Sequence, residues 1–207
     1  MVVNSTNNQI KKKDLEILYF SRNLSVAQIA KSLKCSENKI NYWIKVYGLR
    51  KRSIKDAIYI RKNPKGDPFS FIKPKTLAHS FLFGLGVGLY WGEGTKASKD
   101  SVRLGNTDPD LILYFLKFLS DIYSVDKSKL RFGIQVFEDL DSNEVISFWS
   151  KKLNINKKAF LKVTKTKSRG VGTYKKKIKY GVLTIYFNNV KLRNILMMEI
   201  ERLRKQR

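Results

Sequence analysis

Cysteine and histidine are almost absent, with one of each among 207 residues. A single cysteine excludes an internal disulfide framework and is typical of a reducing compartment. Zinc sites of the usual cysteine–histidine spacing need several such ligands, so they are excluded as well. Acidic residues are also scarce, because 17 Asp and Glu accompany 42 Lys and Arg, which gives a formal net charge of +25.

Long apolar runs are missing too. The most apolar stretch, residues 77–92, is shorter than the roughly 20 residues that a membrane-spanning helix requires. Residues 1–13 contain no apolar segment of the kind that a secretory signal needs. We therefore expect a cytoplasmic, nucleoid-associated protein with no membrane partner.

The positive charge is far larger than the net charge of about 2–8 that keeps a small domain soluble. Such an excess opposes compaction by self-repulsion, and a polyanionic partner explains it. The hydrophobic content of 43% and aromatic content of 12% argue against a disordered chain. We expect a folded protein whose partner is double-stranded DNA and which has no small-molecule substrate.

Residues 14–47 predict three short helices. Ser25 and Gln28 fit a capping box, Ser36 fits the cap of the next helix, and Gly48 fits its end. The lengths and spacing of these helices resemble the helix-turn-helix units of resolvases and homeodomains. We therefore predict a helix-turn-helix domain at 1–52 whose third helix is the recognition helix that contacts the bases. A plain three-helix bundle with a solvated face is the alternative. The predicted DNA-binding residues are Asn38, Lys39, Asn41, Tyr42, Lys45, Arg50, Lys51 and Arg52.

Residues 53–76 are basic and contain three of the four prolines. This composition predicts a linker between the first domain and a second domain at 77–207, with the boundary between Lys62 and Lys75. A basic connector of this kind can follow the DNA backbone.

Residues 84–94 contain five glycines within a pattern that otherwise predicts a helix. The helix should begin near Ala78 or Ser80, and Gly94 should form a left-handed cap after it. Gly84, Gly88 and Gly92 are spaced four apart and so lie along one side of the helix. Because each helical glycine costs roughly 1 kcal/mol relative to alanine, a close contact with a second backbone should compensate. We predict a homodimer interface along these three glycines.

Glu93 occupies an unfavourable place at the predicted helix C-terminus, where the helix dipole disfavours a carboxylate. In a dimer, a second Glu93 nearby would raise its pKa. A bound divalent cation would relieve both effects. The alternative is an exposed glutamate paired with Lys96.

The nine residues Gly86–Gly94 resemble the LAGLIDADG motif of homing endonucleases and their relatives. In that family the motif helix forms the dimer interface, and the acid before the last glycine holds Mg²⁺. The resemblance therefore implies that Glu93 and the Gly92 carbonyl bind Mg²⁺ or another hard divalent cation. The departures include Gly86 for the leading leucine and Trp91 for the first aspartate, and Glu93 replaces the second aspartate with another hard oxygen donor.

Alternating patterns predict strands at 101–107, 130–137, 160–166 and 182–187, with a partner strand at 95–99. Helices are predicted after Asp108, after residue 141 and from Asn188. This order resembles an αββαββα unit of the LAGLIDADG family, enlarged by a strand and a helix between 128 and 155. We therefore expect an α+β fold with a curved antiparallel sheet, preceded by the small all-α domain.

The resemblance also implies a DNA face, since the family reads bases with outward residues of its sheet. Here those residues are Arg103, Arg131, Gln135, Lys162 and Thr164. A basic, acid-free loop follows, and it predicts phosphate contacts at Lys167, Arg169, Lys175, Lys176 and Lys177. The catalytic candidates near the implied metal are Glu93, Asn106, Asp108 and Lys165.

A single motif of this kind suggests a homodimer in which each Glu93 serves one DNA strand. The expected function is site-specific, Mg²⁺-dependent endonuclease cleavage of double-stranded DNA by phosphodiester hydrolysis. The alternative is a non-cleaving transcription regulator on a degenerate LAGLIDADG fold, and an RNA-binding structural protein is a third interpretation.

Overall fold

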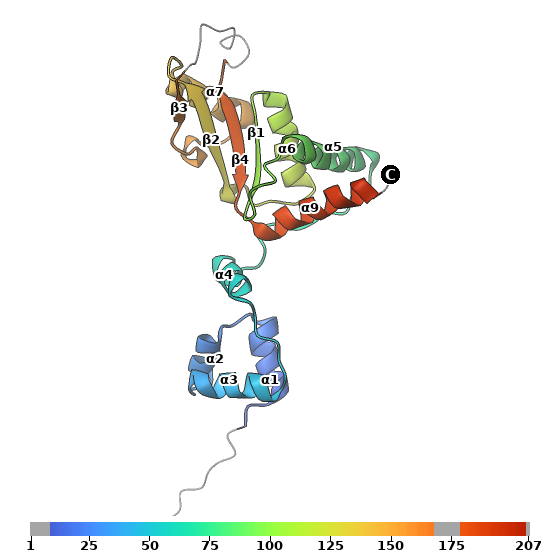
Figure 1. The fold of residues 1–207 in the computed structure, drawn as a ribbon, viewed down its shortest axis with the longest axis vertical. Helices are drawn as coiled ribbons and strands as arrows, with labels where there is room; N and C mark the ends of the chain where they lie inside the picture. The colour runs from blue at the N-terminus through green and yellow to red at the C-terminus, as the bar shows by residue number, and fades with distance from the viewer. Residues whose placement is uncertain (1–8, 168–178, 206–207) are drawn as a thin grey trace, which may run out of the picture. The chain divides into compact units, whose positions relative to one another are not determined.

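A computed structural model describes residues 9–167 and 179–205 of the chain, which divides into two compact units between Gly66 and Asp67 (Figure 1). Each unit has its own hydrophobic core. The division lies inside the segment that the sequence predicts as a linker.

Among its described residues, the first unit is wholly helical. Its elements are α1 (Lys12–Glu16), the π-helical turn η1 (Ile17–Ser21), α2 (Val26–Ser32), α3 (Glu37–Val46) and α4 (Ile54–Lys62). The predicted capping box is confirmed, because Ser25 and Gln28 exchange hydrogen bonds at the start of α2. Ser36 caps α3, and Gly48 ends this segment with a φ of +63°.

The core of the first unit is small. It consists of Leu15, Tyr19, Ile29, Ala30, Ile40 and Ile44. Helix α4 is capped by Ser53 and contributes no buried residue. The start of the predicted linker is therefore helical and belongs to this unit.

Residues 67–76, the rest of the predicted linker, pack on the second unit. The Ser70 amide donates to the Tyr123 carbonyl at 2.9 Å, and the Ile72 amide donates to the Ile122 carbonyl at 2.7 Å. The Phe71 ring contacts Tyr123, with 5.5 Å between the ring centroids. These contacts join the segment to the second core.

The second unit is a mixed α and β structure. Its elements are α5 (Leu77–Glu93), β1 (Val102–Asn106), α6 (Pro109–Asp121), η2 (Lys127–Lys129), β2 (Leu130–Phe137), α7 (Ser142–Leu153), η3 (Lys157–Ala159), β3 (Thr164–Thr166), β4 (Val182–Phe187) and α9 (Val190–Lys205). The described strands form one sheet in the order β1-β4-β2-β3. This confirms the α+β class.

Three features of the expected sheet are wrong. Residues 95–99 form no strand; a single bridge joins Gly94 to Leu104 there. The sheet is not purely antiparallel, because β2 and β3 run parallel. The strand expected at 160–166 is reduced to β3 and a bridge from Phe160 to Phe132. The order of the described elements is therefore αβαβαββα rather than αββαββα with one added strand and helix.

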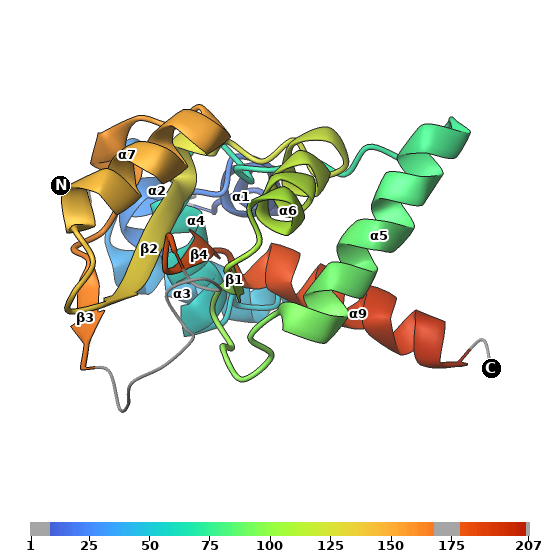
Figure 2. The ribbon, with the colours of Figure 1, turned by 90° about the horizontal axis from the view of Figure 1, so that it is seen from above.

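The buried sides of the strands and helices form one core. The inward strand residues are Val102, Leu104, Leu130, Phe132, Ile134, Val136, Leu183, Ile185 and Phe187. Figure 2 shows α6 and α7 on the same side of the sheet, with α5 and α9 at its β1 end. The alternate strand residues form the opposite side, called here the outward face, and they are partly or fully exposed. No described helix has the length and apolar character of a membrane span.

Candidate nucleic-acid interface

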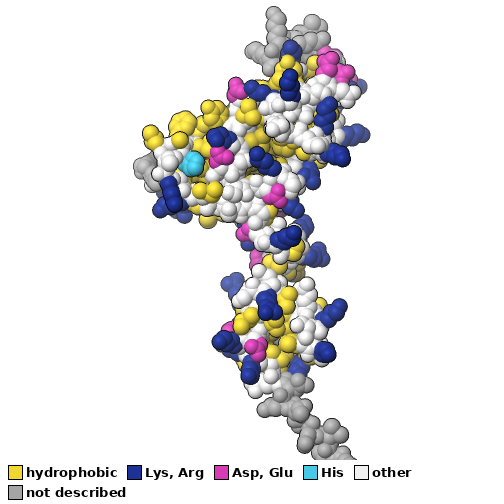
Figure 3. Space-filling view, turned by 180° about the vertical axis from the view of Figure 1, so that it is seen from behind, with side chains coloured by type: hydrophobic (Ala, Val, Ile, Leu, Met, Phe, Trp, Pro, Cys, Tyr) yellow, Lys and Arg dark blue, Asp and Glu magenta, His cyan; other side chains and the backbone are white. Residues whose placement is uncertain are grey.

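One side of α5 is open to solvent along its glycines. A Cβ added at Gly84, Gly88 or Gly92 would meet no atom within 4 Å. Phe81, near the start of the same helix, is 66% exposed. Hydrophobic side chains gather at the surface over this end of the second unit (Figure 3). The predicted dimer interface is therefore accessible to a partner.

Gly86 serves a different purpose from the three open glycines. A Cβ at this position would lie 2.1 Å from Cγ of Phe118. The absence of a side chain therefore lets α5 approach α6 closely. Close packing between α5 and α6 within one chain therefore accounts for the glycine at this position of the motif.

Glu93 is exposed at the end of α5, and its surroundings differ from the expectation. Gly94 has extended backbone angles, so the predicted left-handed cap is wrong. The Lys96 ammonium donates to the carbonyl oxygens of Trp91, at 2.5 Å, and Gly92, at 3.2 Å. A cation thus already offsets the negative end of the helix dipole. The described hydrogen bonds of the Lys96 ammonium are to these carbonyls rather than to the Glu93 carboxylate.

The described residues supply few candidate metal ligands near Glu93. No group of three His, Cys, Asp or Glu side chains comes together among them. Glu93 offers one carboxylate, and the Gly92 carbonyl already accepts from Lys96. Mg²⁺ commonly binds one or two carboxylates together with substrate phosphates. A site at Glu93 therefore fits with water and substrate phosphates, or a second subunit, as the remaining ligands.

The hydrogen bonds described for the other catalytic candidates do not involve Glu93. Asn106 Oδ1 accepts from the Asp108 amide at 2.9 Å, and Asp108 Oδ1 accepts from the Asp110 amide at 2.8 Å. Both side chains thus shape the turn into α6. Lys165 lies on β3, at the opposite edge of the sheet from β1. With strands about 4.8 Å apart, these edges are roughly 14 Å apart.

The outward face brings four of the predicted DNA-binding residues together. In register across β1, β4 and β2, one row contains Arg103, Tyr186 and Arg131. The next row contains Gly105, Thr184 and Gly133. A third contains Val182, Gln135 and Thr164. The arrangement is a polar sheet surface with an arginine on each side of a central tyrosine.

Two residues of this face, Thr184 and Tyr186, were not among the predicted DNA contacts. The inward residues Leu183, Ile185 and Phe187 alternate with them along β4, so the sequence pattern already placed them outward. What the pattern could not supply was the pairing of β4 with both β1 and β2. That pairing puts Tyr186 at the centre of its row, between Arg103 and Arg131.

The arginines of the face are held in position by local hydrogen bonds. Arg103 Nε donates to Ser101 Oγ at 2.7 Å. Arg131 Nη1 donates to the carbonyl oxygens of Ser128, at 2.8 Å, and Leu130, at 2.7 Å. A guanidinium has five N–H donors, so each keeps donors for a phosphate or a guanine.

The lysines near β3 are exposed at the edge of the sheet. Lys162 precedes the strand and Lys167 follows it. Lys165 is in register with the inward residue Val136, so its side chain leaves the strand on the helix side. The remaining predicted contacts of the basic loop, Arg169, Lys175, Lys176 and Lys177, lie outside the described residues.

In the first unit, most of the predicted DNA-binding residues surround one shallow hollow on α3. It has a volume of about 530 Å³ and is lined by Asn38, Asn41, Tyr42, Ile44, Lys45, Leu49 and Lys51. The Tyr42 side chain is 60% exposed. Arg50 is exposed and lies in the sequence between Leu49 and Lys51, which line the hollow. Lys39 is half-buried and does not line the hollow.

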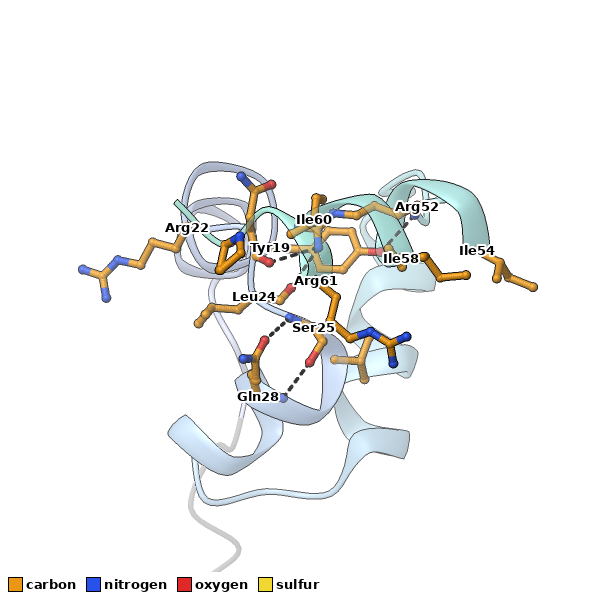
Figure 4. A pocket seen from close by; sticks show the side chains of 14 residues that line it. Tyr19, Arg22, Leu24, Ser25, Gln28, Arg52, Ile54, Ile58, Ile60 and Arg61 are labelled. Atoms are coloured by element: carbon orange, nitrogen blue, oxygen red, sulfur yellow. Dashed lines mark hydrogen bonds between the residues drawn. The ribbon is translucent and has the colours of Figure 1, made fainter. Parts of the chain in front are cut away.

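Arg52 is used inside the first unit. Its Nη1 donates to the carbonyl oxygens of Asn23, at 3.3 Å, and Leu24, at 3.2 Å. The guanidinium carbon lies 4.2 Å from the centre of the Tyr19 ring. Figure 4 shows Arg52 and Tyr19 side by side in a pocket of about 750 Å³. These contacts fasten the chain after α3 to the core, so we leave Arg52 out of the proposed DNA surface.

Two buried tyrosines of the second unit stay protonated. Burial raises the pKa of Tyr90, an effect that the positive charge of Arg193 partly opposes. Burial also raises the pKa of Tyr123. Neither hydroxyl has a hydrogen-bond partner among the described residues. Both rings therefore act as core side chains.

Comparisons of the chain with protein-family models, curated proteins and solved structures find no match. Function must therefore be inferred from the residues and their placement.

Proposed function

We propose that the protein binds double-stranded DNA site-specifically as a homodimer and cleaves it in a Mg²⁺-dependent reaction. The net charge of +25 and two separate polar surfaces support DNA as the partner. One surface is the hollow on α3, where the asparagines suit adenine and the lysines suit phosphate or guanine. Here α2 and α3 act as a helix-turn-helix pair. The other surface is the outward face of the sheet.

The dimer is proposed to form through the open side of α5. Small residues at four-residue spacing allow two helix backbones to approach closely. Phe81 adds apolar area that a second α5 would cover. The two Glu93 side chains, each at the end of its own glycine row, would then lie near the twofold axis.

The single observation that carries the nuclease proposal is that this open row ends beside an exposed Glu93. In the dimer, each carboxylate reaches the DNA from one side of the axis. Magnesium, when bound, would polarise the scissile phosphate and lower the pKa of a water. Glu93 would hold it together with phosphate oxygens. Arg103, on the strand beside the end of α5, would bind an adjacent phosphate.

A second candidate is a DNA-binding regulator that does not cut. It is favoured by the caps that Asn106 and Asp108 form and by the distance of Lys165 from β1. These features give Asn106 and Asp108 a structural role in the turn into α6 and put Lys165 at the opposite edge of the sheet from β1.

Supercoiled plasmid incubated with Mg²⁺ separates the two candidates. The nuclease proposal predicts linear product from the wild-type protein and none from Glu93→Gln. The exposed position of Glu93 makes the variant a fair test, since its fold should be unchanged. If the wild-type protein binds DNA with no product on any substrate library, the regulator replaces the nuclease.

A further inference from the structure

We propose that Tyr186 stacks on an unpaired base of the DNA bound at the outward face. This rests on the proposed use of that face for DNA, and it adds that part of the bound DNA is opened there. The evidence is the position of the ring, the space beside it and the charges that flank it.

Tyr186 stands at the centre of its row. It lies directly across from Arg103 on β1 and from Arg131 on β2. The Arg103 guanidinium carbon is 5.4 Å from the centre of the ring. The ring thus has a cation on the neighbouring strand on each side, which suits a nucleotide whose base and phosphate bind together.

The next row leaves the ring room to lie along the sheet. Gly105 and Gly133 stand on either side of Thr184 and carry no side chain. A Cβ at Gly133 would lie 2.9 Å from Tyr186 Cε2 and 3.2 Å from the hydroxyl oxygen. The ring therefore leans over Gly133 and remains partly exposed.

This shape suits an unpaired base better than a base pair. In a duplex, each base is covered above and below by its neighbours, so only its edges can be read in the grooves. A base that has left the stack exposes its flat surface, and aromatic side chains on open sheets bind such surfaces. One stacked base typically changes affinity by about 5- to 150-fold.

An aromatic side chain that leans over a glycine also stabilises the pairing of its two strands. If Tyr186 only stabilises strand pairing, the protein should bind paired and unpaired DNA with the same affinity. The two roles therefore differ in a measurable way.

The test compares a fully paired duplex with one of the same length that contains a short run of central thymine–thymine mismatches. Both carry the same number of phosphates, so the non-specific electrostatic attraction is matched. Affinities are measured by fluorescence anisotropy for wild type, Tyr186→Phe and Tyr186→Leu, and thermal unfolding of each variant is recorded. We expect wild type to bind the mismatched duplex about tenfold tighter, Tyr186→Phe to keep this ratio and Tyr186→Leu to bring it close to one.

A second measurement uses only the wild-type protein, in case Tyr186→Leu does not fold. Mismatched thymines are replaced by 5-iodouracil, which photo-crosslinks to a stacked aromatic ring, and the crosslinked peptide is identified by mass spectrometry. The proposal predicts a crosslink at Tyr186. Equal wild-type affinities for the two duplexes, a ratio unchanged in Tyr186→Leu, or crosslinks confined to other residues such as Tyr42 would overturn it.

These outcomes are distinct from failure of the proposed function. If wild type binds the paired duplex but shows no preference, only the stacking role of Tyr186 fails. If neither duplex binds, the DNA-binding function itself fails.

Discussion

The Lys96 ammonium lies 2.5 Å from the carbonyl oxygen of Trp91, in the last turn of α5. It also reaches the Gly92 carbonyl, so one side chain satisfies two acceptors that the helix leaves without intrahelical donors. The positive charge required by a helix that ends in a glutamate is thus supplied by the chain itself. Under the proposed function, the exposed Glu93 carboxylate would act on the bound DNA.

Replacing Lys96 by methionine should destabilise the second unit. The variant loses a charged donor at a helix C-terminus, which typically contributes about 0.3–1 kcal/mol. Urea unfolding should show this loss, whereas Lys99→Met, an exposed change in the following loop, should have no effect. Equal unfolding free energies for the two variants would mean that the contact contributes nothing.

Alanine substitutions at Gly86 and Gly88 should have opposite effects. At Gly86 the new methyl group would overlap the Phe118 ring, and overpacking of this kind costs about 1–3 kcal/mol. At Gly88 the site is open, so the helix should gain up to about 1 kcal/mol from the better helix propensity of alanine. Denaturant unfolding of the two variants, at matched protein concentration, measures both. Similar destabilisation by both changes would contradict the assignment of the open side.

Arg131→Ala should weaken binding to duplex DNA and flatten its salt dependence. If Arg131 contacts one phosphate, the slope of log K against log salt should decrease by about 0.9. Anisotropy titrations at several salt concentrations give the slope. Lys152→Ala is the matched control, because Lys152 is paired with Asp110 at 2.9 Å on the helix side. An identical slope for Arg131→Ala and wild type would show that Arg131 makes no phosphate contact.

Lys51→Ala and Arg52→Ala should separate binding from stability, although the residues are neighbours. Lys51 lines the hollow on α3, so its loss should reduce DNA affinity and leave the unfolding transition unchanged. Arg52 holds two carbonyl groups and the Tyr19 ring, so its loss should cost the first unit about 1–3 kcal/mol. Thermal unfolding and anisotropy together test the pair. If Arg52→Ala is as stable as the wild type but binds DNA more weakly, Arg52 contacts DNA rather than stabilising the first unit.

The sequence predicted best what depends on local pattern. The strands at 130–137 and 182–187 match β2 and β4 residue for residue, since inward and outward side chains alternate cleanly in both. The caps at Ser25 and Ser36 follow from hydrogen bonds within one helical turn. Such features are encoded by residues close together in the chain.

Features that depend on long-range pairing could not be predicted. The parallel pairing of β2 with β3, the packing of 67–76 against residues 122–123 and the central place of Tyr186 all require distant segments to meet. The candidate site shows the same limit. Glu93 and the open glycines come from one helix, whereas the distance of Lys165 from β1 follows only from the strand order.

Sedimentation of the wild-type protein and of Gly88→Leu, each alone and on duplex DNA, tests most directly whether α5 joins two subunits. Gly88→Ala is the control, because a methyl group is still small enough for close helix contact. We predict that wild type and Gly88→Ala sediment as dimers and that Gly88→Leu sediments as a monomer. A wild-type protein that stays monomeric on DNA, or a Gly88→Leu protein that remains dimeric, would contradict the account.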